Sequence, residues 1–361
     1  MNRTHFFSFL LIALFIVLLA TAPVAGSMPD ADRMEELGQR AALTAMDRLE
    51  FSKGDPDILV LTNAGRAVVD GQTTERAISG ITDVGGQRNS DGTLYQVNRP
   101  SWKPLWFYFY DKASGNGLYL EPDQAYYARN DTEQNDLSDT EVFSTIAPVT
   151  GDLDRMLADP EVANKTLKAL GQNAGSLVSI PNCWARGATY DLMSTAMLHD
   201  HLCPGVTAGY LVVKHVEEVL PITDGTSYTV IACPHWCKDD AFPVMWDITP
   251  GKGGPTLVDL SSDDEETLKA KYNVSPVGII VRWNSTAKTG QGIAVGFDWD
   301  ECTPWDGPSW AYNHATSVEM MEYLATPEKY VSVIEEFEVN QTMLSALKNP
   351  ANNPYEVIGM L

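Results

Sequence analysis

An internal repeat limits the fold of this chain more than any other feature of its sequence. Three segments of the first half recur in the same order in the second half: residues 81–86 match 248–254, residues 105–117 match 277–292, and residues 157–161 match 324–328. Repeats this far apart give related domains and not a solenoid, whose units span about 20 to 50 residues. We therefore predict two domains of similar fold.

Hydrophobic periodicity predicts helices and strands in a similar order in both halves. In the first half the pattern predicts a helix over 34–49 and strands over 57–61 and 105–110. In the second half the predicted elements are a helix over 204–220, strands over 227–232, 277–283 and 292–297, and helices over 317–324 and 328–338. Helices packed on a small mixed sheet make each unit an α+β domain.

The domain boundaries follow from these elements. We predict a first domain over 28–149, a helical linker over 150–182 and a second domain with C-terminal helices over 183–361. The polar strip 123–139 is predicted to be a surface loop. Domains of about 150 residues are long enough to bury a hydrophobic core.

The N-terminus has the layout of a cleavable signal peptide, which we predict over residues 1–27. Arg3 is followed by an apolar run over 6–20 and by the small residues of 21–27. A signal peptide has this order of basic, apolar and small residues. An uncleaved membrane anchor is the alternative, because a bilayer span needs about 20 apolar residues. In either case we expect the rest of the chain to be extracytoplasmic, secreted or attached to the cell envelope.

The chain is strongly acidic, with a formal net charge of -23 at pH 7. Nucleic acid is excluded as a partner, because phosphate binding needs clustered Lys and Arg. Sequons for N-glycosylation begin at Asn130, Asn164, Asn273, Asn284 and Asn340. Acidity and sequons together leave a further alternative, in which the protein is a structural glycoprotein of the cell envelope.

Cysteine and histidine are confined to the second half once the predicted signal peptide is set aside. Residues 28–182 contain neither. The chain has 5 Cys, an odd number, so at least one thiol stays outside any disulfide framework. Chemistry that uses thiol or imidazole groups must therefore belong to the second domain.

The densest cluster of such groups is His199-Asp-His-Leu-Cys-Pro-Gly205. In an extended segment alternate side chains share a face, so His199, His201 and Cys203 are predicted to point the same way. Pro204 is a favoured first residue of a helix. Cys203 then lies at a helix N-terminus, where backbone N–H groups and the helix dipole favour the thiolate, the form that binds metal.

A second cluster, Cys233-Pro-His-Trp-Cys237, follows the predicted strand over 227–232. Sulfur together with imidazole suits zinc or iron, or alternatively copper. A disulfide between Cys233 and Cys237 is the other interpretation, because an exported protein can form one. Asp239 and Asp240 are either general bases or part of a solvated turn.

The remaining cysteines and histidines are predicted to have structural roles. We expect Cys183 and Cys302 to form a disulfide or to be packed thiols, and not to be metal ligands. His215 lies within the predicted helix over 204–220, and His314 precedes the C-terminal helices. Isolated histidines of this kind are usually structural or solvated.

The two clusters resemble the motifs of the FmdE family, which is named after a component of formylmethanofuran dehydrogenase. Residues 199–205 differ at one position from its H-G-H-x-C-P-G signature, with Asp200 in place of Gly. Residues 237–254 are similar to its second motif, a Cys followed by Asp-Ala and a T-P-G-K-G-N turn, with Gly254 in place of Asn. The resemblance covers about residues 190–297.

The resemblance implies a small α+β domain that binds a metal, commonly zinc, and pairs as a dimer. It implies His201, Cys203 and Cys237 as ligands, with His199 beside them as a ligand or as a support for one. With Cys233 added from the residue pattern, the candidate metal ligands are His199, His201, Cys203, Cys233 and Cys237. The first domain is then a degenerate FmdE-like repeat that replaces the second copy of the dimer, which makes the chain an intrachain pseudo-dimer.

We therefore expect a protein that binds a transition metal, zinc or iron, or a small metal-bound ligand. The resemblance leaves open a homo-oligomer, and the N-terminal pattern leaves open association with the cell envelope. The enzyme alternative is a metal- or thiol-dependent oxidoreductase, in which the metal activates water or Cys203 is a nucleophile.

Overall fold

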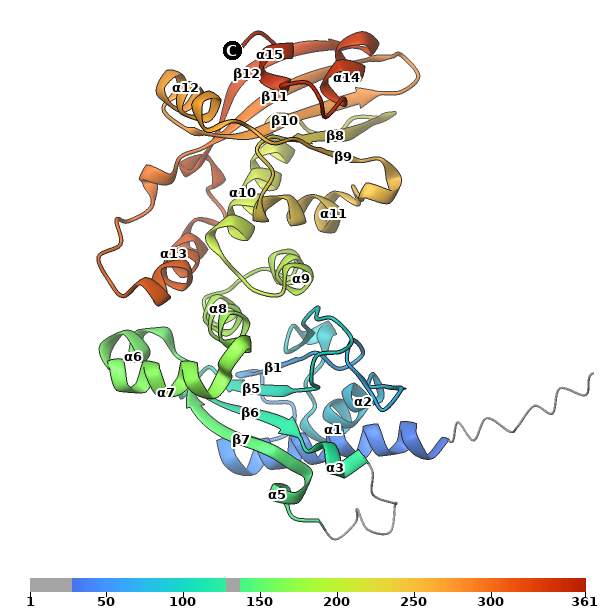
Figure 1. Cartoon of the computed structure of the whole chain (residues 1–361), viewed down its shortest axis with the longest axis vertical. Helices are drawn as coiled ribbons and strands as arrows, with labels where there is room; N and C mark the ends of the chain where they lie inside the picture. The colour runs from blue at the N-terminus through green and yellow to red at the C-terminus, as the bar shows by residue number, and fades with distance from the viewer. Residues whose placement is uncertain (1–27, 128–136) are drawn as a thin grey trace, which may run out of the picture.

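The computed structural model describes residues 28–127 and 137–361, and it contains two five-stranded sheets with accompanying helices (Figure 1). The predicted signal peptide, the sequon at Asn130 and much of the predicted loop over 123–139 lie outside the described residues. Within the described residues, no helix is both long enough and apolar enough to cross a membrane. Helices on mixed sheets confirm the predicted α+β class.

The first unit consists of one sheet and the helices that cover its outer face. Its elements in chain order are α1 (Met28–Leu49), β1 (Ile58–Thr62), β2 (Val68–Val69), β3 (Gln72–Thr73), α2 (Arg76–Gly85), β4 (Leu94–Gln96), β5 (Phe107–Asp111), β6 (Asn116–Pro122), α3 (Gln124–Tyr127), α5 (Asp139–Val142) and β7 (Phe143–Thr150). The sheet order is β4-β1-β5-β6-β7.

Helices connect the two sheets: α6 (Leu153–Ala158), α7 (Pro160–Leu170), α8 (Ala174–Ala185) and α9 (Tyr190–His199), with a 3-10 turn, η2, over Gly171–Asn173. An aspartate precedes each of the first two of these helices. Asp152 accepts a hydrogen bond from Arg155 N at the start of α6, and Asp159 accepts from Glu161 N at the start of α7. Side-chain acceptors of this kind satisfy backbone donors that a helix leaves free at its N-terminus. The helical character predicted for 150–182 is thus present.

The second unit has the sheet order β12-β11-β10-β8-β9. Its elements in chain order are α10 (Pro204–Val219), β8 (Thr226–Ala232), η3 (Cys237–Asp240), α11 (Ala241–Trp246), β9 (Pro255–Leu257), α12 (Ser262–Tyr272), β10 (Ser275–Asn284), β11 (Thr289–Phe297), α13 (Tyr312–Met320), β12 (Val331–Asn340), α14 (Gln341–Leu347) and α15 (Pro354–Val357).

The two sheets share one topology. In the first, β1 pairs in parallel with β4 and antiparallel with β5, and β6 and β7 continue antiparallel. In the second, β8 pairs in parallel with β9 and antiparallel with β10, and β11 and β12 continue antiparallel. Two of the three sequence matches fall on equivalent places. Residues 105–117 and 277–292 both contain a hairpin, and residues 81–86 and 248–254 both precede the parallel strand. The units thus form a tandem arrangement.

The third sequence match does not fall on equivalent elements. Residues 157–161 follow β7, whereas residues 324–328 precede β12. Both segments place a proline at the first position of a helical turn, Pro160 in α7 and Pro327 in a short 3-10 turn. Proline favours that position wherever a helix begins, so this similarity reflects local helix-start chemistry.

The helix predicted over 328–338 is wrong, because this segment is the edge strand β12, paired with β11. The sequence Val-Ser-Val-Ile-Glu-Glu-Phe-Glu-Val-Asn is rich in β-branched and aromatic residues, which suit a half-buried strand. Its glutamates favour a helix locally, which is why the sequence pattern predicted one. The hydrogen bonds that β11 offers to a neighbour override this local preference.

The described residues form three hydrophobic cores, which lie between the sheets and the helices. The outer face of the first sheet packs against α1 and α2, and that of the second sheet against α12, α14 and α15. The inner faces of both sheets contribute to one central core with the helices α8, α9, α10 and α13, which lie between the sheets in Figure 1. The helices predicted as a linker are therefore part of a core that both units share.

Candidate metal centre

The first cluster lies in a turn between two helices. His199 is the last residue of α9, and Asp200 ends the helix in the left-handed region, with a φ of 76°. Cys203 caps α10, and Pro204 is its first residue. The prediction of an extended segment over 199–203 is therefore wrong. Asp tolerates a positive φ better than most residues, and a helix that ends there turns the chain back. The predicted position of Cys203 at a helix N-terminus is confirmed.

The second cluster approaches the same point from the end of β8. The short turn η3 lies directly against α10 because two glycines of that helix leave room for it. A Cβ atom at Gly205 would lie 2.8 Å from Cβ of Cys237, and one at Gly209 would lie 2.2 Å from the carbonyl oxygen of Lys238. Contacts this short do not occur in folded proteins. Glycine at these two positions thus allows Cys237 to reach the N-terminus of α10.

The approach of these segments brings three donor atoms together. The ligand atoms of His199, Cys203 and Cys237 all lie within 4.8 Å of one another. Cys203 Sγ is 3.9 Å from His199 Nε2. Donor atoms around a tetrahedral zinc ion lie roughly 3.3 to 3.8 Å apart, given bond lengths of about 2.0 to 2.3 Å. A small inward movement of these side chains would therefore bring them within bonding distance of one ion.

His199 is oriented by a carboxylate. Its Nδ1 donates to Asp240 Oδ2 at 2.7 Å, which leaves Nε2 facing Cys203. A carboxylate on the far nitrogen is the usual support of a metal-binding histidine, because it fixes the tautomer and the ring orientation. Asp240, for which the sequence left a general base or a solvated turn open, is thus placed behind the site.

His201 lies beside His199, with the two ring centroids 4.6 Å apart. Its Nδ1 donates to Asp200 Oδ1 at 2.7 Å. The other carboxylate oxygen of Asp200 pairs with Arg99, which belongs to the first unit. Asp200, where the FmdE signature has Gly, therefore links His201 to a cation from the other half of the chain. Arg99 was not predicted, and no feature of the local sequence indicates it.

The histidines favour ionisation of one thiol. Burial opposes the charge on Cys203, but hydrogen bonds from His199 and His201 and from the backbone N–H of Val206 lower its pKa to about 6. The hydrogen bond to Asp240 raises the pKa of His199 to about 9, and the bond to Asp200 does the same for His201. Without a metal ion, the site therefore holds a thiolate next to imidazolium groups at neutral pH.

The second thiol has the opposite shift. Burial and the charge of Cys203 raise the pKa of Cys237 to about 11. A bound cation would reverse this order, because metal binding favours the deprotonated form of each ligand. The pair of cysteines can thus offer one thiolate without a metal and two with one.

Cys233, the remaining candidate ligand, is not brought into this group. Side chains alternate faces along a strand, and Cys233 continues the outward-facing side of β8 together with Ile231. Its sulfur is 4.0 Å from the carbonyl oxygen of Asp259, and burial raises its pKa to about 12. Cys237, four residues further on, lies on the side of the central core.

All five cysteines are free thiols in the structure. The disulfides considered between Cys233 and Cys237, and between Cys183 and Cys302, are therefore not formed. Cys183 is instead a packed thiol in the central core, with 0% exposure. Burial raises its pKa to about 12, so it is inert as a nucleophile at neutral pH.

The isolated histidines are buried. His215 lies within α10 and His314 within α13, and Nδ1 of each lacks a hydrogen-bond partner among the described residues. Burial, and then the charge of His201, lower the pKa of His314 to about 4. His314 is therefore neutral at pH 7 where it is buried in α13.

Comparison with protein families gives a match for the second unit. Residues 198–330 match the model of a protein family described as "FmdE, Molybdenum formylmethanofuran dehydrogenase operon". The match includes His199, Cys203 and Cys237 and ends directly before β12 begins at Val331. No curated protein matches the chain.

Proposed function

We propose that this chain, whose residues 198–330 form an FmdE-family domain, binds a transition metal ion through His199, Cys203 and Cys237, with zinc or iron as the metal. The observation that carries the proposal is the convergence of one imidazole and two sulfur donors within 4.8 Å. These donors come from α9, α10 and η3, so their meeting depends on the fold and not on sequence proximity.

The donor set fits the proposed metals. Thiolate and imidazole ligands are typical of zinc and iron, whereas calcium and magnesium need oxygen ligands. Three protein ligands leave a coordination position for water, for a small ligand or for His201, which lies next to His199. A zinc or iron ion held there would supply a Lewis acid. The protein's own part is to orient His199 through Asp240 and to keep Cys203 ionised.

The biological role that we propose is binding of the metal, or of a small molecule through the metal, outside the cytoplasm. The extracytoplasmic location rests on the order of basic, apolar and small residues over 1–27. The shared topology of the two sheets supports the proposal that the first unit is a degenerate FmdE-like repeat in place of a second chain. Fractionation of the producing cells and N-terminal sequencing of the mature chain test the location.

Elemental analysis of the purified full chain tests the metal site. We expect close to one equivalent of zinc or iron, and its loss in Cys203→Ser and in Cys237→Ser. Cys302→Ser is the matched control, because this thiol is half-buried and lies outside the converging group. Metal-free protein from cells supplied with both metals, or a full equivalent in Cys203→Ser, would overturn the proposal.

A second candidate function, thiol-dependent redox chemistry, is favoured by the lowered pKa of Cys203. A thiolate at a helix N-terminus next to histidine is the usual form of a reactive cysteine. Labelling of the metal-loaded chain with iodoacetamide separates the two functions. A ligand is protected until a chelator removes the metal, whereas a free catalytic thiolate reacts at the same rate with and without the chelator.

A further inference from the structure

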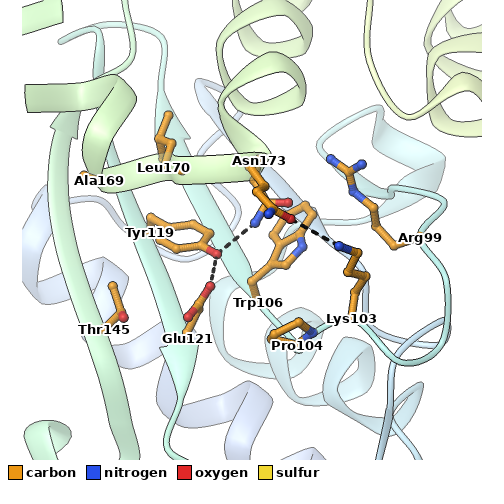
Figure 2. A pocket seen from close by; sticks show the side chains of 12 residues that line it. Arg99, Lys103, Pro104, Trp106, Tyr119, Glu121, Thr145, Ala169, Leu170 and Asn173 are labelled. Atoms are coloured by element: carbon orange, nitrogen blue, oxygen red, sulfur yellow. Dashed lines mark hydrogen bonds between the residues drawn. The ribbon is translucent and has the colours of Figure 1, made fainter. Parts of the chain in front are cut away.

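A cavity that no cysteine lines lies on the inner face of the first sheet. Its volume is about 350 Å³, and small-molecule sites in proteins span about 300 to 1,000 Å³. Its walls are β6, Thr145 of β7, the segment over 99–106, and the end of α7 with the turn η2 that follows it (Figure 2). Neither the FmdE match nor the metal centre accounts for this cavity, because residues 198–330 do not line it.

The cavity has an apolar, aromatic base. Trp106 and Tyr119 are each only 2% exposed, and their ring centroids are 6.4 Å apart. Leu170 and Pro104 extend the apolar wall. Ligand sites are usually built this way, with an apolar base that buries the body of the ligand and a few polar groups that fix its orientation.

Three charged side chains line the cavity: Arg99, Lys103 and Glu121. The ammonium of Lys103 donates to the amide oxygen of Gln172 at 3.1 Å, and the carboxylate of Glu121 accepts from the hydroxyl of Tyr119. Within 28–127 and 137–361, neither Lys103 nor Glu121 takes part in an ion pair. Figure 2 shows them on opposite sides of Trp106. Arg99 is already paired with Asp200, so Lys103 and Glu121 are the cation and the anion that the cavity can offer to a ligand.

The carboxylate is held in place by a chain of hydrogen bonds. Asn173 Nδ2 donates to the hydroxyl of Tyr119 at 2.9 Å, and that hydroxyl donates to Glu121 (Figure 2). Because Asn173 belongs to the turn that closes the cavity, this chain fixes Glu121 relative to the opposite wall. A carboxylate prepared in this way loses little entropy when it binds a cationic group.

We propose that this cavity binds a small zwitterion of the amino-acid class, with its carboxylate at Lys103 and its ammonium at Glu121. Charge-assisted hydrogen bonds at both ends fix the orientation, and the side chain lies on Trp106. A ligand with only one of the two charges leaves Lys103 or Glu121 without its ionic partner.

Calorimetry on the full chain, with each standard amino acid as a probe, tests the proposal. At least one amino acid is expected to bind with a dissociation constant in the micromolar to millimolar range. The tightest probe is then compared with the amine that lacks its carboxylate and with the acid that lacks its ammonium group. Each analogue is expected to bind at least tenfold more weakly, a difference of about 1.4 kcal/mol.

Variants locate the binding. Glu121→Gln and Lys103→Gln are each expected to weaken the tightest amino acid at least tenfold. Glu322→Gln and Lys269→Gln, which change exposed residues outside the cavity, leave its affinity unchanged. Lys103 is exposed, so its replacement leaves the core intact and carries the test even if Glu121→Gln is unstable. The proposal is overturned if no standard amino acid binds, if Lys103→Gln binds as the natural chain does, or if a singly charged analogue binds equally well.

Discussion

The guanidinium of Arg99 pairs with the carboxylate of Asp200, and this pair joins the unit without cysteine or histidine to the candidate metal centre. Arg99 also donates to Ser176 Oγ at 2.7 Å, which anchors it to α8. The other oxygen of Asp200 accepts from His201. The first unit therefore fixes a histidine of the second through one carboxylate, although it contributes no ligand itself.

Replacing this arginine should weaken metal binding. In Arg99→Met the carboxylate of Asp200 loses its cationic partner, so the ring of His201 is held less firmly. Groups that orient metal ligands typically contribute about 10- to 100-fold to affinity, and we expect a loss of about tenfold. Competition with a chromophoric chelator measures it. Arg76→Met, which breaks the pair of Arg76 with Glu35 far from the centre, should leave affinity unchanged.

The carboxylate behind His199 should matter more. Asp240→Asn replaces an anionic acceptor with a neutral amide, so Nδ1 of His199 is held more weakly and in a less defined tautomer. We expect a loss of metal affinity of about 10- to 100-fold, measured by the same competition. Asp247→Asn serves as the control, since Asp247 is exposed and pairs only with Lys252 within the described part of the chain. Equal affinities of the two variants would contradict this role of Asp240.

The contact of α10 with η3 predicts a large effect from one methyl group. Gly209→Ala places a Cβ 2.2 Å from the carbonyl oxygen of Lys238, so the helix and the turn must separate. We expect the free energy of unfolding to fall by about 1 to 3 kcal/mol, the usual cost of overpacking. In Gly251→Ala the new Cβ meets nothing within 4 Å, and the change should stay within about 0.5 kcal/mol. Chemical denaturation compares the two.

The buried histidine of α13 should make the fold sensitive to acid. Burial, and then the charge of His201, lower the pKa of His314 from 6.5 to about 4. The unfolded chain therefore binds this proton more readily, and stability that is fully present above about pH 6.5 is lost as the pH falls toward 4. The loss amounts to about 3 kcal/mol.

His314→Leu should remove this part of the acid sensitivity while it keeps a buried apolar side chain. The measurement is the change in unfolding free energy between pH 7 and pH 4.5 for the natural chain and the variant. The charged groups that face His314 include His201, whose own pKa is raised to about 9, so the comparison uses the difference between slopes. Identical slopes would exclude His314 as the source.

Cys233 should be dispensable for metal binding. Its sulfur faces the outer core of the second sheet, away from Cys203. Cys233→Ala is therefore expected to keep the full metal content, with a loss of stability of about 1 kcal/mol from the removed sulfur atom. Elemental analysis measures the metal content, and thermal unfolding measures the loss of stability. Loss of the metal in a folded variant would restore Cys233 as a ligand.

Much of the fold was predictable because it depends on local patterns. The continuous apolar runs of β1 and β5, and the proline that begins α10, mark these elements in the sequence. The edge strand β12 was not predictable in this way. Its glutamates favour a helix locally, and only pairing with β11 makes it a strand.

The sequence by itself determined that cysteine and histidine supply the donors of the site. It also determined that Cys203 lies at a helix N-terminus, because Pro204 follows it and begins α10. Tertiary structure decided the rest. It placed Cys237 in the group and turned Cys233 away, because Cys233 follows β8 into the outer core, whereas the turn η3 brings Cys237 to the side of the central core. It also brought Arg99 to Asp200, since packing of the two sheets around shared helices joins segments that no local pattern relates.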